Sequence, residues 1–170
     1  MASQTYREQV ALLLTVLPGV AKEDCFAMHG GTAINLFLRD MPRISVDIDL
    51  TYLPLENRAI SIENINSSLQ RVKSRIEKLN LEIVVEHKKD SGKLLIIRKS
   101  VLIKLEVNLV MRGVIASTQL LPLCKRAQHE FEMYSEMTIV PFGQLFGGKY
   151  CAALDRQHPR DMFDVKYQLG

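Results

Sequence analysis

The sequence predicts an α/β or α+β protein in which helices flank a mixed β-sheet. Two observations favour this class: segments with helical and strand-like apolar spacing alternate over the first half of the chain, and three consecutive strand-like runs follow from residue 81 on. A length of 170 residues, 47% of them apolar and 24% charged, is typical of one globular domain. We therefore expect a single domain over residues 1–170.

Composition excludes few function classes. The formal net charge of +3 permits contact with polyanions but falls far short of the dense Lys/Arg patches of a dedicated nucleic-acid binder. Cys25, Cys124 and Cys151 are odd in number and lack CxxC spacing, which favours reduced, buried thiols in a cytoplasmic protein over a disulfide framework. No stretch reaches the roughly 20 apolar residues of a membrane span, so we expect no membrane association.

The first three elements are expected at residues 5–17 (helix), 25–28 (strand) and 32–38 (helix). Apolar residues recur at helical spacing in the first, and Pro18 with Gly19 predicts its end. The second is a short apolar run that leads into Gly30 and Gly31. Thr32 would then cap the following helix.

A strand and a long helix are expected next, at residues 45–52 and 56–79. Apolar and polar residues alternate in the strand, so that Ile48 and Leu50 lie on one face while Asp47 and Asp49 lie on the other. The helix is charged at helical intervals, and a break is expected near Ser61.

The remaining elements are expected at residues 81–88, 93–99, 101–111 and 138–140 (strands) and 123–131, 141–154 and 160–169 (helices). Asp90-Ser91-Gly92 between the first two of these strands is typical of a hairpin. In the third, Glu106 and Asn108 share a polar face.

Gly30 and Gly31 stand between a strand and a helix. Backbone N–H groups at such a helix start can bind a phosphate, which the helix dipole also stabilises, and glycines let the phosphate approach closely. The alternative is a tight turn with Thr32 as an ordinary N-cap. The sequence leaves both alternatives open.

Asp47 and Asp49 point to the same side of their strand, about 6 to 7 Å apart. Two carboxylates at this spacing can share a divalent cation, and Glu106 would supply a third oxygen ligand for Mg²⁺. The alternative is a solvated strand face, which is weakened for the aspartates because Asp is a poor strand former. Glu106 is equally compatible with a ligand and with an exposed strand residue.

The end of the chain concentrates charged residues around small ones. Lys149 on a helix would neutralise phosphate charge, and Asp161 and Asp164 lie one helical turn apart. The alternative is structural: Asp161 would favour the positive N-terminal end of the last helix, and Arg160 would pair with Asp164.

Five motifs occur in a fixed order between residues 25 and 166. They are His29-Gly30-Gly31-Thr32-Ala33, Arg43-x-Ser45-x-Asp47-x-Asp49, Lys104-x-Glu106-x-Asn108, Gly148-Lys149-x-x-Ala152 and Pro159-Arg160-Asp161-x-x-Asp164. Taken together, they resemble the AbiEii/AbiGii-type nucleotidyltransferase toxins of the DNA polymerase beta-like nucleotidyltransferase superfamily.

The resemblance implies a nucleotidyltransferase fold and the transfer of a nucleoside monophosphate from a nucleoside triphosphate (NTP) to an acceptor hydroxyl. It implies catalytic roles for Asp47, Asp49, Glu106, Lys149, Asp161 and Asp164, of which the first three would bind metal. It implies NTP binding by Gly30, Gly31, Thr32, Arg43, Ser45 and Lys149. The cofactor would be Mg²⁺, as two ions, with Mn²⁺ as an alternative. In studied relatives the acceptor is the 3′ end of tRNA, and transfer to that end stops translation.

The resemblance also implies a cognate antitoxin, in a toxin–antitoxin or phage-defence system. Many members continue into a helical C-terminal region, which would begin at about residues 142–170, so the chain is either a compact member or a piece of a longer protein. Two alternatives to an RNA acceptor stay open: a protein hydroxyl as acceptor, and a non-catalytic module that only binds nucleotide or a protein partner.

Overall fold

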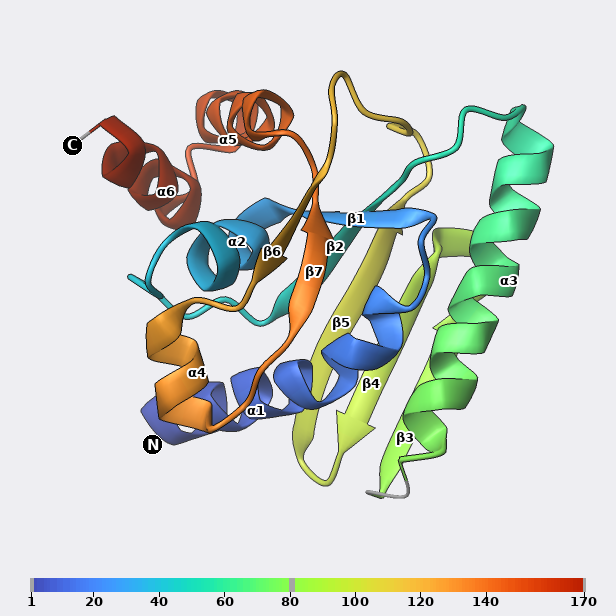
Figure 1. The fold of residues 1–170 in the computed structure, drawn as a ribbon, viewed down its shortest axis with the longest axis horizontal. Helices are drawn as coiled ribbons and strands as arrows, with labels where there is room; N and C mark the ends of the chain where they lie inside the picture. Colours follow the sequence, from blue (N-terminus) through green and yellow to red (C-terminus); the bar gives the residue numbers. More distant parts are fainter. Residues whose placement is uncertain (1, 80–81, 170) are drawn as a thin grey trace.

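A computed structural model describes residues 2–79 and 82–169 as one seven-stranded mixed sheet with flanking helices (Figure 1). The strands are β1 Phe26–His29, β2 Asp47–Tyr52, β3 Ile83–Lys88, β4 Lys93–Arg98, β5 Val101–Asn108, β6 Gln119–Pro122 and β7 Glu136–Ile139. They lie in the order β3-β4-β5-β2-β1-β7-β6. The β1/β7 and β2/β5 pairs are parallel and the other four pairs are antiparallel, so the predicted mixed sheet is confirmed.

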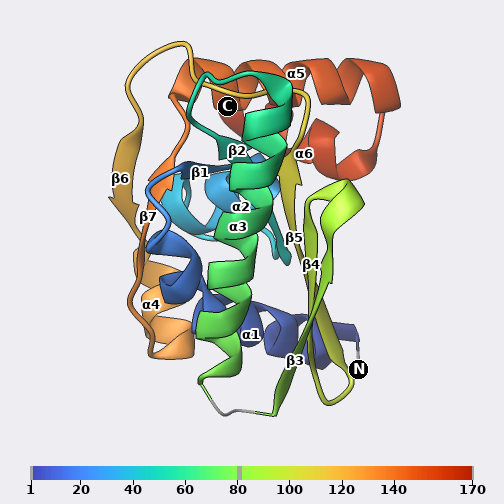
Figure 2. The same ribbon diagram turned by 90° about the vertical axis from the view of Figure 1, so that its right-hand side faces the viewer.

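Helices cover the sheet and one of its ends. They are α1 Ala2–Ala21, α2 Gly30–Ala33 with the π-helix Ile34–Leu38 that continues it, α3 Arg58–Glu77, a 3₁₀ turn Lys89–Ser91, α4 Lys125–Phe131, α5 Phe142–Arg156 and α6 Pro159–Leu169. Helices α1 and α3 contact each other and pack on the sheet, while α5 and α6 pair at one end, near α2 (Figures 1 and 2). Within the described ranges, no helix has the length and apolar character needed to cross a bilayer.

Strand β2 lies at the centre of the polar face that the sequence predicted. Its Ile48 and Leu50 are completely buried on the opposite face, as expected from the alternation. Asp49 stands opposite His29 on β1 and opposite Glu106 on β5. Glu106 in turn stands opposite Lys93 on β4. Four neighbouring strands therefore place His29, Asp49, Glu106 and Lys93 in one cross-strand row.

Two helix predictions are wrong at their ends. Helix α1 continues through Pro18 to Ala21, because a proline near the end of a helix removes one backbone hydrogen bond while the last turn still buries Val20 completely. Thr32 does not cap α2, since the helix starts at Gly30 after His29. The Thr32 hydroxyl instead donates to the Asp47 carbonyl and is hydrogen-bonded to the Ser45 hydroxyl. The expected break at Ser61 is also absent, since α3 is continuous and buries this residue.

Two strand predictions differ from the structure, and part of a third lies outside the described residues. Strand β5 ends at Asn108 rather than at residue 111, because the Asn108 side chain accepts hydrogen bonds from the next two free backbone N–H groups and turns the chain. Strand β6 was not predicted, since it is a mostly exposed edge strand without apolar alternation. The expected start of β3 at Leu81 lies outside the described residues.

The three cysteines are free thiols, as predicted. Cys25 and Cys124 are partly buried, and burial raises the pKa of both thiols. Cys151 is exposed on α5, so the expectation that all three are buried is wrong for this residue. A small side chain such as that of Cys151 can lie on the buried or on the exposed face of an amphipathic helix. The composition of the chain does not tell which face it occupies.

Candidate active site

A pocket of about 730 Å³ opens between α5 and the ends of β1, β2 and β5. The strand and turn residues that line it include His29, Gly30, Gly31, Asp49, Thr51, Lys93 and Glu106. Those of α5 include Gln144, Leu145, Gly148, Lys149, Ala152 and Arg156. One concave site therefore collects residues from four of the five sequence motifs.

The glycine turn is required by the side chains that pack on it. Gly30 has a φ of +79°, and a Cβ atom there would lie 2.5 Å from Asp49 Oδ2. A Cβ atom on Gly31 would lie 2.6 Å from an Arg43 guanidinium nitrogen and 3.0 Å from Ser45 Oγ. The two glycines thus bring the turn into direct contact with Asp49 on one side and with Arg43 on the other.

The carboxyl group of Asp49 is buried in the pocket wall close to two other carboxylates. Burial raises the pKa of Asp49 to about 6, and the charges of Asp47 and Glu106 add to this effect. Lys149 and Arg156 act in the opposite direction without compensating it. A group with this perturbation in a pocket is a candidate for a functional site.

Glu106 has a basic partner that the sequence analysis missed. Lys93 Nζ lies 3.1 Å from Glu106 Oε2, and both side chains are between one third and one half exposed. The short connection Lys99-Ser100 between β4 and β5 could have identified this lysine, because it fixes the register that sets Lys93 opposite Glu106.

The structure does not bring all three predicted metal ligands together in the pocket lining. Asp49 and Glu106 line the pocket, whereas Asp47 lies two residues earlier on β2, outside the lining. Among the described residues, no three Asp, Glu, His or Cys side chains are close enough as they stand to hold one metal ion.

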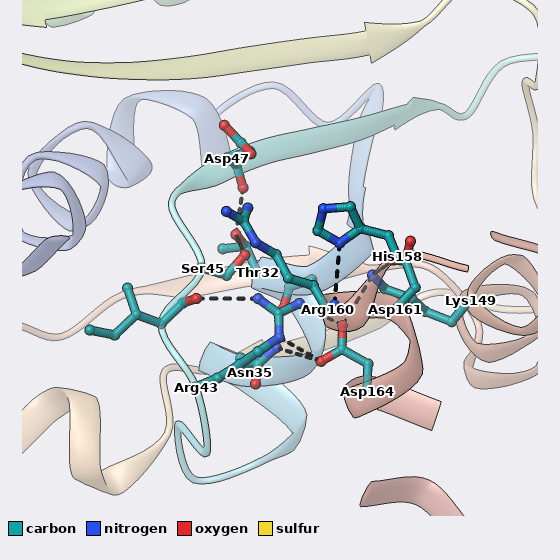
Figure 3. A network of polar contacts seen from close by, with 12 residues as sticks. Thr32, Asn35, Arg43, Ser45, Asp47, Lys149, His158, Arg160, Asp161 and Asp164 are labelled. Carbon is teal, nitrogen blue, oxygen red and sulfur yellow. Dashed lines mark hydrogen bonds and ion pairs between the residues drawn. The ribbon is translucent and has the colours of Figure 1, made fainter. Parts of the chain in front are cut away.

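Lys149 is held by the two late aspartates (Figure 3). Its ammonium lies 2.8 Å from Asp161 Oδ1 and 3.0 Å from Asp164 Oδ2. Arg43 binds the same Asp164 in a bidentate manner, at 2.8 and 2.6 Å. Arg156 completes the network, 3.2 Å from Asp161 Oδ2.

The late aspartates are ionised and buried. Burial opposes their ionisation, but hydrogen bonds from Arg43 and Lys149 hold the pKa of Asp164 below its usual value. Burial likewise opposes ionisation of Asp161, whose pKa is held low by the hydrogen bond and charge of Lys149. Neither residue lines the pocket, so their carboxylates face the cations of the network rather than the cavity.

The structural alternative considered for this helix is wrong in one respect. Asp164 pairs with Arg43 and Lys149, not with Arg160. The backbone N–H of Arg160 instead donates to His158 Nδ1, which precedes the helix (Figure 3). Asp164 therefore pairs with Arg43, 121 positions away in the sequence, and not with the nearby Arg160.

Thr32, Ser45 and Asn35 support the turn from behind. Thr32 is completely buried, and its hydroxyl ties the turn to the start of β2 through Ser45 and the Asp47 carbonyl. Asn35 Nδ2 donates to the Gly31 carbonyl at 2.8 Å and to Asp164 Oδ1 at 3.3 Å. In the sequence, Asn35 is marked only by being a single amide among apolar residues.

His29 forms the wall of the pocket beside Asp49. Burial lowers the pKa of its imidazole, and the charge of Lys149 contributes to the same shift. His29 is therefore neutral at physiological pH.

Comparisons with known proteins agree with this geometry. The family model described as "Nucleotidyl transferase AbiEii toxin, Type IV TA system" matches residues 11–169. The fold is similar to that of "MenT4, nucleotidyltransferase toxin Rv2826c from Mycobacterium tuberculosis H37Rv", with a TM-score of 0.64 and 16% sequence identity. That match covers 96% of this chain and 58% of the MenT4 chain, so this chain spans little more than half of that protein. No curated protein matches the sequence. The chain belongs to the AbiEii nucleotidyl transferase toxin family of type IV toxin–antitoxin systems.

Proposed function

We propose that the pocket transfers a nucleoside monophosphate from an NTP to an acceptor hydroxyl, with the 3′ end of tRNA as the acceptor. The observation that carries the proposal is the convergence of Gly30, Asp49, Glu106 and Lys149 on one pocket. In the reaction, the acceptor oxygen forms a bond to the α-phosphorus, the bond from that phosphorus to the β-bridging oxygen breaks, and pyrophosphate leaves with the released electron pair. The acceptor hydroxyl loses its proton to water.

Asp47, Asp49 and Glu106 are the residues that would hold Mg²⁺, as two ions, or Mn²⁺ in its place. The chemistry of the donor set fits a hard divalent cation, since it consists of carboxylate oxygens. Asp49 and Glu106 both line the pocket and stand opposite each other on paired strands, so a cation bound there would lie near two carboxylates. Burial, and after it the charges of Asp47 and Glu106, raises the pKa of Asp49 to about 6, and a bound cation would favour its ionised form. When bound, such ions polarise the phosphate and stabilise the charge on the leaving group.

The chain's own groups have separable roles in this proposal. Lys149, with 12% of its side chain exposed, is placed to offset triphosphate charge from α5. The Gly30-Gly31 turn would present backbone N–H groups to the phosphates. Asp161 and Asp164 would act as positioning residues that fix Lys149 and Arg43.

Thr32, Arg43 and Ser45 would serve NTP binding through the turn. Thr32 is completely buried, and none of the three residues lines the pocket. Their hydrogen bonds to Asp47, to one another and to Asp164 fix the turn against β2 and α6. We therefore assign them a positioning role and not direct contact with the nucleotide.

The family supports a toxin that is neutralised by a cognate antitoxin. MenT4 is described as a nucleotidyltransferase toxin, and the family and the shared fold support the proposal of the same activity for this chain. The tRNA acceptor and a cytoplasmic site of action rest on the family resemblance.

Incubation with each α-labelled NTP, Mg²⁺, total tRNA and total protein tests the proposal. We expect label on the tRNA 3′ end with the wild-type protein, none with Asp49→Asn, and full labelling with the control Asp90→Asn. Asp90 is exposed on the hairpin outside the pocket lining. Label in the protein fraction would replace tRNA by a protein hydroxyl as the acceptor. Triphosphate binding without any transfer would contradict the enzyme and favour a binding module.

A further inference from the structure

The pocket continues past its charged part to an apolar end. Helix α5 contributes lining residues from Gln144 through Lys149 to Arg156, and Gln144 is hydrogen-bonded to Gly113 and Ile115 in the loop that follows Val110 and Met111. Gln144 and Arg156 are twelve residues apart, which is about 18 Å along a helix. A nucleotide whose phosphates lie at Lys149 therefore has room to place its base toward Gln144.

Val110 and Met111 form this apolar end, and we refer to the two residues as the apolar ledge. They line the pocket, yet 74% of Val110 and 66% of Met111 is exposed. They follow β5 directly, so they lie only a few residues beyond Glu106. The apolar ledge is thus continuous with the candidate active site.

Hydrogen bonds fix the apolar ledge in its exposed position. Asn108 Oδ1 accepts from the backbone N–H groups of Val110 and Met111, both at 2.9 Å. The Gly113 N–H donates to the Tyr52 carbonyl at 2.7 Å.

Two further side chains hold the segment that follows. Gln144 accepts from the Ile115 N–H at 3.1 Å and donates to the Gly113 carbonyl at 3.3 Å. The Arg112 guanidinium donates to the Glu56 carbonyl and to Ser61 Oγ. These hydrogen bonds hold the loop against β2, α3 and α5. The ledge is therefore already ordered, and ligand binding does not have to cost the entropy of ordering it.

The exposure of the apolar ledge favours a ligand that covers it with an apolar surface. Keeping two apolar side chains in water is unfavourable, and this loop holds them there by backbone hydrogen bonds instead of folding them inward. A nucleobase has a flat face of low polarity that an apolar wall can cover. It is also the part of an NTP that lies farthest from the triphosphate bound at the charged end.

We propose that Val110 and Met111 bind the nucleobase of the NTP. This inference rests on the proposed function, because it requires the triphosphate to lie at Lys149. The ledge supplies contact area, while the pocket's charged end supplies phosphate binding, so the two contributions can be separated by a probe that has phosphates and no base. Inorganic tripolyphosphate is such a probe.

Calorimetric titration with each of the four ribonucleoside triphosphates and with tripolyphosphate, all with Mg²⁺, tests the ledge. Met111→Ser and Val110→Ser are each expected to weaken binding of the best NTP about fivefold to tenfold, because each removes apolar contact with the base. Tripolyphosphate binding is expected to stay unchanged. The matched control is Ile115→Ser, on the same loop, 79% exposed and outside the pocket lining; it is expected to change neither affinity.

Three results would overturn the inference. Equal effects of Met111→Ser and Ile115→Ser would make the ledge irrelevant to the base. Equal affinity of the wild-type protein for tripolyphosphate and for every NTP would show that the base is not bound, although the phosphate site would stand. Binding of neither probe would refute the proposed function together with the ledge.

Discussion

Replacing Asp49 by Asn is expected to stabilise the metal-free protein while abolishing nucleotide transfer. Burial, with the charges of Asp47 and Glu106, raises the pKa of Asp49 from 3.8 to about 6. A shift of about 2 units corresponds to about 3 kcal/mol against the ionised form. Because Asp49 is only partly shielded from water, we expect about 1 to 2 kcal/mol to be measurable.

The sign of the effect depends on pH. A carboxyl group whose pKa is higher in the folded than in the unfolded protein destabilises the fold increasingly as the pH rises from the unfolded pKa to the folded pKa, and by a constant amount above it. The penalty is therefore absent below about pH 4 and complete above about pH 6. The amide that replaces the carboxyl group carries no charge at any pH, so Asp49→Asn should gain stability at pH 7.5 and gain little at pH 4.5.

Thermal unfolding in metal-free buffer measures this difference. At pH 7.5 the melting temperature of Asp49→Asn should exceed that of the wild type by about 3 to 6 °C. Addition of Mg²⁺ should raise the melting temperatures of the wild type and of the control Asp90→Asn, but not that of Asp49→Asn. The control Asp90→Asn, on the exposed hairpin, should match the wild type at both pH values. No gain at pH 7.5, or the same gain at pH 4.5, would refute the electrostatic account of Asp49.

Three further predictions concern the turn, the ion-pair network and the basic neighbour of the metal site. Gly30→Ala should lower stability by more than about 1 kcal/mol in urea unfolding and abolish transfer, because a side chain at φ +79° is strained and meets a carboxylate. Gly147→Ala, with no atom within 4 Å of its Cβ, should instead match or exceed wild-type stability. Asp164→Asn should cost about 3 kcal/mol in the same assay at pH 7, since it leaves Arg43 without its buried carboxylate and Lys149 with Asp161 alone. Because the pKa of this aspartate is held low, that difference should persist at pH 5 and shrink only under more acidic conditions. The Lys93→Met protein should bind free Mn²⁺ several-fold more tightly in calorimetric titration, because the substitution removes a cation 3.1 Å from the Glu106 carboxylate. The control Lys88→Met, which removes the partner of Glu86, should leave the Mn²⁺ affinity unchanged. Unchanged Mn²⁺ affinity of Lys93→Met would contradict this role of Lys93.

The polar face of the sheet was predictable because a strand has a period of two. Alternation assigned Asp47 and Asp49 to one side of β2 and Ile48 to the buried side, and the structure confirms both. The pairing of Asp49 with Glu106 was suggested by the shared motif order, and parallel pairing of β2 with β5 provides it.

Contacts between distant segments were not predictable from local patterns. Arg43 and Asp164 are 121 positions apart, and only the packing of α6 on the turn brings them within 2.6 Å. The edge strand β6 and the continuation of α1 through Pro18 have the same cause, since neighbouring elements override weak local preferences. The exposure of Val110 and Met111 was not predicted either, because the sequence predicted that the strand continues to residue 111. In the structure the Asn108 side chain accepts hydrogen bonds from the N–H groups of Val110 and Met111, and the strand ends at Asn108.

The network around Lys149 explains why the late acidic motif accompanies the lysine in the sequence. Two buried carboxylates hold the ammonium from behind, while the pocket side of Lys149 stays available to a ligand. This arrangement fixes a long, flexible side chain before the triphosphate binds, which reduces the entropy that binding would otherwise cost.

The mass of the tRNA 3′-terminal fragment, recorded together with the pyrophosphate released, tests the central claim most directly. With NTP and Mg²⁺, the wild-type protein should add whole nucleoside monophosphates to that fragment and release one pyrophosphate for each, and Asp49→Asn should do neither. An unchanged fragment mass without pyrophosphate release from the wild-type protein would contradict the account.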